Sequence, residues 1–352
     1  MKAAVSLLRN HFGFARLHVK SASLEKYRFD PLRRGHALEA IIPSYQNEYY
    51  HPKCRFIQYI RAGDTCKRLA MVSENGCKMI ELSSMTCASP DMLQFIQQRY
   101  CMESLLESSQ FMEVTDVLND LRLLPPIDAP GKIIGVATNY YDTCEERKQK
   151  VPKNPEFFVK FNTSVTGALD NIRAHHIAKA SSLQYLSDTR IDYGCQLAVV
   201  IGTKCRNVPR PSAMGCVFGY TIAQDITARD WNVLLGGQTL LGKSLDTFCP
   251  LGSVIVHKSH VPDVNNLWIK THVNGEERQN SNTRNMIFKI DTLIHQLSQF
   301  MTLCPGDIIL TGTPAGIGAH RSPSCFLKPG DLLESEIQKL GKMRNKVINP
   351  YA

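Results

Sequence analysis

Short runs of hydrophobic residues, separated by turn residues, dominate the chain from Lys132 onward and predict a domain built mainly of β-strands. The runs are GVAT, EFFVKF, LAVVIG, VFGYTIAQD, SVIVH, LWIKTHVNGEERQ and DIILTG. Within the sixth run, Asn274-Gly275 predicts a hairpin turn. The segment IDTLIHQLSQFM predicts the clearest helix, because its apolar residues recur at helical spacing: Ile290, Leu293, Ile294, Leu297 and Met301.

The first third of the chain has a different pattern of hydrophobic and polar residues. Residues 55–83 alternate in polarity and predict a β-meander with a hairpin turn at 74–76. Ser89-Pro90-Asp91 precedes a predicted helix, DMLQFIQQRY, and a second amphipathic segment extends to about Leu121. The Pro-rich stretch 123–132 indicates a linker. We therefore expect an α+β, β-rich fold with a leader at 1–35, a small β/α domain at 50–125 and a larger domain at 132–349.

The formal net charge of +9 is concentrated at the start of the chain. Residues 1–35 hold eight basic and two acidic side chains, so the remainder is nearly balanced, and no basic stripe with interleaved aromatics indicates nucleic-acid binding. The first 24 residues contain no acid and mix bases with apolar residues, which predicts a mitochondrial transit peptide and a matrix location. The alternative is a disordered basic tail. No apolar run is long enough for a membrane span.

Twelve cysteines are scattered along the chain without a CxxC pair or a Cys/His cluster at zinc spacing. Several lie in apolar runs, as small hydrophobic residues do in a reducing compartment. We expect no structural zinc site.

Three polar motifs are weak signals when each is taken alone. TGTPAGIG at 311–318 has the wrong spacing for a phosphate-binding loop and is typical of a turn after a strand. Asp225 in AQDITARDW is placed to bind a cation or to cap a turn. Lys243 in LGKSLDTFCPLG has apolar neighbours, where a lysine serves as a structural ion-pair partner or faces an oxyanion.

The order of the motifs is far more specific. NYYDTCEE, FFVKF, DYGCQLAVVIG, QDITARDW, LGKSLDTFCPLG and PGDIILTGTPAGIG follow one another from Lys132 to Val347 in a way that resembles the fumarylacetoacetate hydrolase family. The resemblance implies a homodimeric enzyme with a mixed β-roll. It also implies that Mg²⁺, or Mn²⁺ or Ca²⁺, is held by a Glu-x-Glu strand and an Asp and chelates a 2-oxo acid or 1,3-dicarbonyl as its enolate. A His-x-x-Glu dyad would supply the base.

The family's roles fall on particular residues of this chain. The resemblance places Glu146 at the dyad glutamate and Lys243 at the lysine that faces the enolate. Lys160 and Thr313 match substrate-contacting positions. The implied metal ligands are Asp225 and Gln196.

Three demanding positions depart from the family pattern. The Glu-x-Glu pair is replaced by Gly194-Cys195-Gln196, and Thr143 stands at the dyad histidine. Glycine offers no ligand, an amide carries no charge, and threonine is no base near pH 7. Metal binding is therefore expected to be weakened or lost. Strand alternation places Asp192 on the face of positions 194 and 196 as a replacement ligand. Other candidate replacements for the lost ligands and the lost base are Cys144, Glu145 and His175-His176, although each is more simply a turn or surface residue.

Two classes of function remain open. One is an enzyme that acts on a 2-oxo acid such as oxaloacetate, with keto–enol tautomerisation as the leading reaction and acylpyruvate-type C–C hydrolysis as the alternative. The other is a non-catalytic family member that binds a 2-oxo acid or serves as a dimer partner. A third explanation is an error in the sequence at the altered positions.

Overall fold

The computed structural model describes residues 55–61, 63–73, 78–82, 91–98, 112–113, 121–174, 190–234, 237–252 and 254–349, which belong to the unit that spans residues 35–352. The predicted leader, the turn at 74–76, most of the second amphipathic segment and His175-His176 lie outside the described residues. Among the helices that are described, none is long and apolar enough to cross a membrane.

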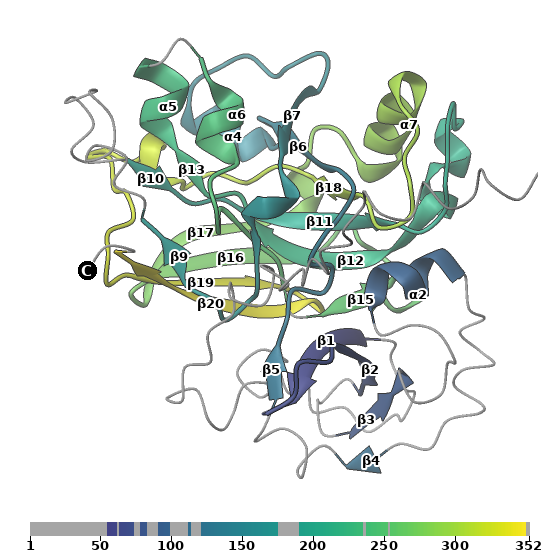
Figure 1. The fold of residues 1–352 in the computed structure, drawn as a ribbon. Coiled ribbons are helices and arrows are strands. Elements are labelled where there is room, and N and C mark those ends of the chain that lie inside the picture. The colour runs from purple at the N-terminus through teal and green to yellow at the C-terminus, as the bar shows by residue number, and fades with distance from the viewer. Residues whose placement is uncertain are drawn as a thin grey trace, which may run out of the picture. The chain divides into compact units, whose positions relative to one another are not determined.

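An eleven-stranded sheet forms the largest element of the unit (Figure 1). Its order is β4-β3-β2-β1-β15-β12-β11-β18-β6-β7, with β5 paired to β1. The strands from the first third of the chain are β1 (Arg55–Arg61), β2 (Arg68–Val72), β3 (Lys78–Glu81), β4 (Met112–Glu113) and β5 (Leu121–Leu123). Those from the rest are β6 (Ile133–Ala137), β7 (Glu156–Lys160), β11 (Cys195–Ile201), β12 (Val217–Gln224), β15 (Ile255–His257) and β18 (Ile308–Leu310).

A second sheet contains five strands in the order β17-β16-β19-β20-β9. They are β9 (Ile172–Arg173), β16 (Trp268–Val273), β17 (Glu276–Asn282), β19 (Leu332–Ile337) and β20 (Gly341–Ile348). Asn274 and Gly275 both have positive φ between β16 and β17, as a tight hairpin turn requires. Two short ladders complete the strands: β10 (Ile191–Asp192) with β13 (Thr227–Ala228), and β14 (Cys249–Pro250) with β8 (Val165–Thr166).

The described helices are short. They are α2 (Met92–Gln98), α4 (Tyr141–Glu146), α5 (Arg229–Leu234), α6 (Thr239–Lys243) and α7 (Ile290–Phe300), with 3₁₀ turns η5 (Asn162–Ser164), η7 (Arg210–Cys216), η8 (Lys258–His260), η9 (Thr283–Asn285) and η10 (Gly318–His320). Helix α5 packs on α6, and α6 contacts β7 and β13 (Figure 1). At α2, Asp91 accepts a hydrogen bond from the Gln94 amide (2.8 Å), which identifies Asp91 as the cap.

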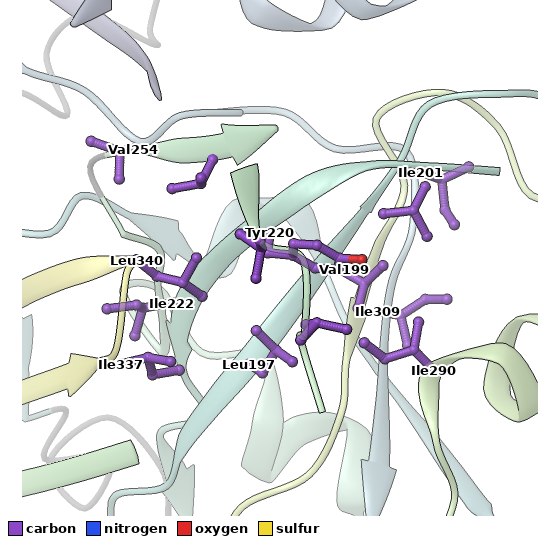
Figure 2. Packing of buried hydrophobic residues seen from close by; sticks show 14 of the residues in the cluster. Leu197, Val199, Ile201, Tyr220, Ile222, Val254, Ile290, Ile309, Ile337 and Leu340 are labelled. Carbon is purple, nitrogen blue, oxygen red and sulfur yellow. The ribbon is translucent and has the colours of Figure 1, made fainter. Parts of the chain in front are cut away.

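The main core lies between the two sheets and helix α7. Figure 2 shows Ile222 of β12 close to Ile337 and Leu340 near the turn between β19 and β20, and Ile309 of β18 close to Ile290 of α7. Strand β11 is buried on both faces. Leu197, Val199 and Ile201 face this core, whereas Ala198 packs into a separate cluster with residues of β6, β14 and β18. Since side chains alternate along a strand, Gln196 points away from the second sheet.

The sequence patterns predicted most of these elements. The meander, the strands after Lys132 and helix α7 are confirmed. Along α7, Ile290, Leu293, Ile294 and Leu297 are buried as expected. The predicted helix extends one residue too far: Met301 is 37% exposed, and extended backbone at its position ends the helix after Phe300.

Candidate functional site

The carboxylate of Asp225 is the centre of a buried group of charged side chains. Asp225 directly follows β12, on the sheet face shared with Gln196. Its Oδ1 receives a hydrogen bond from Lys160 Nζ at the end of β7 (2.9 Å), and its Oδ2 receives one from Lys243 Nζ at the end of α6. Three elements thus bring together residues that lie 65 and 18 positions apart in the chain.

Neighbouring groups fix both lysines. Lys160 Nζ also donates to the carbonyl oxygen of Ile226 (3.0 Å), and Lys243 Nζ donates to Thr227 Oγ1 (2.9 Å). The Lys243 ammonium lies 4.4 Å from the ring centre of Phe158, a cation–π contact. Gly135 makes space for that ring, since a Cβ at this position would overlap it.

The group carries an excess of positive charge in a buried place. Exposure is 0% for the Lys160 side chain, 7% for Asp225 and 10% for Lys243. Burial alone would raise the pKa of Asp225, but the ammonium groups of Lys160 and Lys243 outweigh burial and hold this pKa at about 2. Burial lowers the pKa of Lys243 to about 8 although Asp225 opposes the shift, so Lys243 is mostly protonated at pH 7. Two ammonium groups therefore share one carboxylate.

The amide of Gln196 completes the group. Its Nε2 donates to Asp225 Oδ2 (3.2 Å), and its Oε1 accepts from the Gly312 amide (2.7 Å). Both ends of this side chain are thus engaged.

Thr313 lies beside the position where the family pattern has lost a glutamate. A Cβ placed on Gly194 would be 3.2 Å from the Thr313 side chain, so the threonine occupies part of the space next to the glycine. Thr313 Oγ1 accepts from Gln279 Nε2 (2.8 Å), and its carbonyl oxygen accepts from Thr143 Oγ1 (3.1 Å). Thr143 therefore serves as a buried hydrogen-bond donor to the loop after β18.

Glu146 belongs to a different set of contacts. It lies at the end of α4, accepts from the Gly316 amide through Oε1 (3.1 Å) and faces His320 Nδ1 through Oε2 (3.2 Å). No hydrogen bond between described residues joins Glu146 to the Asp225 group. Of its neighbours in α4, Cys144 is buried with a free thiol and Glu145 is exposed.

Asp192 lies on the strand face of positions 194 and 196, as the alternation predicted, because Asp192 pairs with Thr227 and Gln196 pairs with Ala223 in one continuous register. The side chain of Asp192 is, however, already engaged by other groups of the protein. Its fully buried carboxylate accepts from the amides of Gly318 (2.7 Å) and Ala319 (3.1 Å) and from Arg229 Nε (2.9 Å). Asp192 therefore anchors the turn η10.

Comparison with known proteins identifies the family. The family model described as fumarylacetoacetate (FAA) hydrolase C-terminal matches residues 132–348. The chain belongs to the fumarylacetoacetate hydrolase family. A Rattus norvegicus relative named "Oxaloacetate tautomerase Fahd2a, mitochondrial" is 40% identical over 275 residues, covering 78% of this chain and 85% of the relative. The Homo sapiens relative "Oxaloacetate tautomerase FAHD2A, mitochondrial" is 38% identical over 297 residues, covering 84% and 91%.

Solved structures of the family share the fold. Fumarylacetoacetate hydrolase from Exiguobacterium antarcticum superposes with a TM-score of 0.72 at 30% identity, covering 84% of this chain and 99% of that protein. Maleylpyruvate hydrolase from Sphingobium sp. SYK-6, solved in complex with manganese(II) and pyruvate, gives a TM-score of 0.65 at 27% identity, with the same two coverages. The α+β, β-rich fold expected from the sequence is confirmed.

The donors around Asp225 do not fit a divalent cation. Mg²⁺ and Mn²⁺ take several oxygen ligands, preferably carboxylates. Gly194 provides none, Gln196 Oε1 is held by Gly312, and both oxygens of Asp225 are bound by ammonium groups. Across the described ranges, no cluster of three or more His, Cys, Asp or Glu side chains is arranged to hold a metal ion.

The structure thus separates the predicted site residues into two neighbourhoods. In the first, Asp225 is in direct contact with Lys160, Lys243 and Gln196. In the second, Glu146 lies with His320, and Thr313 contacts Gln279 and Thr143. Sequence reasoning missed Thr227, Phe158 and His320. Of these, His320 alone offered a signal, as a histidine two residues after the TGTPAGIG motif.

Proposed function

We propose that this chain binds a 2-oxo acid such as oxaloacetate at the Lys160–Asp225–Lys243 group and catalyses its keto–enol tautomerisation without a divalent cation. The observation that carries the proposal is the buried excess of positive charge, because one carboxylate faces two ammonium groups. A buried charge without a partner is costly, so such a group favours the uptake of an anion. The names of the rat and human relatives support oxaloacetate as the substrate.

The chemistry follows from where negative charge develops. Moving a proton off the carbon beside a carbonyl places negative charge on the carbonyl oxygen. An ammonium group close to that oxygen stabilises the enolate more than the neutral ketone, and so lowers the barrier. Lys243 is suited to this role because Thr227 and Phe158 fix its position, while Lys160 is fully enclosed and holds Asp225. In the metal-binding relatives a cation would supply this charge.

Oxalate, a dianion that resembles the enolate of a 2-oxo acid, provides the test. We expect the wild-type protein to bind oxalate in calorimetry and to accelerate conversion of enol to keto oxaloacetate. Lys243→Met removes one charge-assisted contact and is expected to weaken oxalate binding by about 10- to 100-fold. Lys270→Met is the matched control, because Lys270 lies against Trp268 on the outer face of β16 and its loss should leave binding unchanged.

Each result discriminates between the candidate functions. Absence of oxalate binding by the wild-type protein would contradict the proposal. Oxalate binding without turnover would contradict the catalytic part and favour the non-catalytic binder. Cleavage of an acylpyruvate in place of tautomerisation would favour the hydrolase.

Three further expectations remain predictions. The homodimer rests on the family resemblance alone. The transit peptide lies outside the described residues, and the matrix location is supported by the word "mitochondrial" in the names of the relatives.

A further inference from the structure

The imidazole of His320 occupies a setting that suits proton transfer. Its Nδ1 lies 3.2 Å from Glu146 Oε2, the residue at the family's dyad glutamate. The two residues are 174 positions apart, so this contact depends on the folded chain. Their side chains are only partly exposed, 19% for His320 and 24% for Glu146. A histidine thus accompanies Glu146 although position 143 is threonine.

Rigid support holds His320 in place. It is the last residue of η10, whose Gly318 and Ala319 amides are bound by the buried carboxylate of Asp192. A Cβ on Gly318 would overlap the carbonyl oxygen of Cys325 and lie 2.8 Å from Asp192 Oδ1, so this backbone path requires glycine. Glu146 is held as well, because its carboxylate accepts a hydrogen bond from the Gly316 amide.

The contact with Glu146 selects the useful tautomer of the imidazole. A carboxylate beside Nδ1 accepts its proton as a hydrogen bond and leaves the lone pair on Nε2. In the described part of the chain, Nε2 has no hydrogen-bonding partner. Burial lowers the pKa of His320, and the positive charges of Arg147 and Arg229 add to that effect, while Glu146 opposes it. The ring is therefore mainly neutral at pH 7 and able to accept a proton.

One loop connects the His320–Glu146 pair to the Lys160–Asp225–Lys243 group. Residues 311–320 run from β18 to the end of η10, with Gly312 bound to Gln196 at one end and His320 facing Glu146 at the other. Arg229 follows β13, which holds Thr227, and its charge lowers the pKa of both Lys243 and His320. The positive charge of Arg229 thus acts on both groups.

We propose that His320, oriented by Glu146, is the catalytic residue that carries the substrate proton in this chain. It would take the role that the family pattern gives to a histidine at position 143, where this chain has threonine. The inference rests on the proposed tautomerase function. His320 Nε2 takes a proton from the carbon beside the carbonyl. The C–H electron pair forms the C=C bond, and the carbonyl π pair moves to the oxygen beside Lys243. Water then protonates that oxygen and the imidazolium returns its proton to solvent, so the net change is an isomerisation.

The test compares His320→Ala with His272→Ala in the full-length protein. His272 on the outer face of β16 lies 4.0 Å from Glu277 and is the matched histidine–glutamate control. We expect His320→Ala to lower kcat by about 10²- to 10⁴-fold, to leave oxalate affinity within about 3-fold of wild type, and to regain turnover when imidazole is added. His272→Ala should match wild type.

The pH profile supplies a reading that a structural role would not change. Wild-type turnover should fall at low pH as His320 takes up a proton, and His320→Ala should lack that limb. Glu146→Gln removes the charge that raises the His320 pKa, so the limb should move to lower pH.

The outcomes separate the two proposals. An active wild type with an equally active His320→Ala variant would contradict the role of His320 and leave the tautomerase function standing. If His320→Ala loses both turnover and oxalate binding, and added imidazole does not restore turnover, His320 has a structural role and the inference is contradicted. A wild type without turnover would contradict both.

Discussion

Replacing Asp225 with asparagine is expected to lower the free energy of unfolding by about 3–5 kcal/mol, because the change leaves two buried ammonium groups without a carboxylate. Lys160 is fully enclosed and its Nζ has only Asp225 and a carbonyl oxygen as hydrogen-bond acceptors among the described residues. Denaturant unfolding at pH 7 measures the difference. Asp291→Asn is the matched control, because its partner Arg210 is 58% exposed and such surface pairs contribute about 0–1 kcal/mol.

The loss should depend on pH in a defined direction. The pKa of Asp225 is held at about 2, below its ordinary value of 3.8. The ionised carboxylate therefore contributes its full stabilisation above pH 3.8 and loses it as the pH falls toward 2. The gap between wild type and Asp225→Asn should shrink over that window. A gap no larger than that of Asp291→Asn at pH 7 would show that the lysines do not need this carboxylate.

Restoring the two carboxylates, with Gly194→Glu and Gln196→Glu in one protein, is expected to create stoichiometric Mn²⁺ binding where the wild type has none. The carboxylate introduced at position 196 would lie beside Asp225. Together with the carboxylate introduced at position 194, it would bring the number of carboxylates to three, against two ammonium groups. An excess of carboxylates suits a hard dication. Thr313 must shift by a few tenths of an ångström, since a Cβ on Gly194 is 3.2 Å from its side chain.

Calorimetry with Mn²⁺ measures this gain. Gly215→Glu is the control for an added carboxylate, since a Cβ there meets nothing within 4 Å. Equal Mn²⁺ affinity in the wild-type and restored proteins would mean that the present donors already suffice, contrary to the geometry around Asp225.

Local sequence patterns predicted the fold well because each element is specified by residues that lie close together in the chain. The spacing of Ile290, Leu293, Ile294 and Leu297 located the buried face of α7, and Asn274-Gly275 located the hairpin. The failure lies where an element ends. Met301 continues the helical spacing but follows the last turn of α7. Periodicity alone does not mark such boundaries.

The site was predictable only in part, for a physical reason. The order of the motifs selected Lys160, Asp225, Lys243 and Gln196, which the fold does bring into contact. The order of the motifs does not identify the hydrogen-bonding partners of these residues. That both oxygens of Asp225 hold ammonium groups depends on how β7, β12 and α6 meet, and the His320–Glu146 contact joins segments that no local pattern relates.

The central claim is that two lysines supply the positive charge that a divalent cation supplies in metal-binding relatives. The most direct test is the rate of enol-to-keto conversion of oxaloacetate by the wild-type protein, measured after exhaustive chelation and again with added Mn²⁺ or Mg²⁺. We expect the enzyme-dependent rate to be the same within about 2-fold in all three conditions, since Lys160 and Lys243 remain in place. A rate that vanishes with chelator and returns with metal would contradict the account.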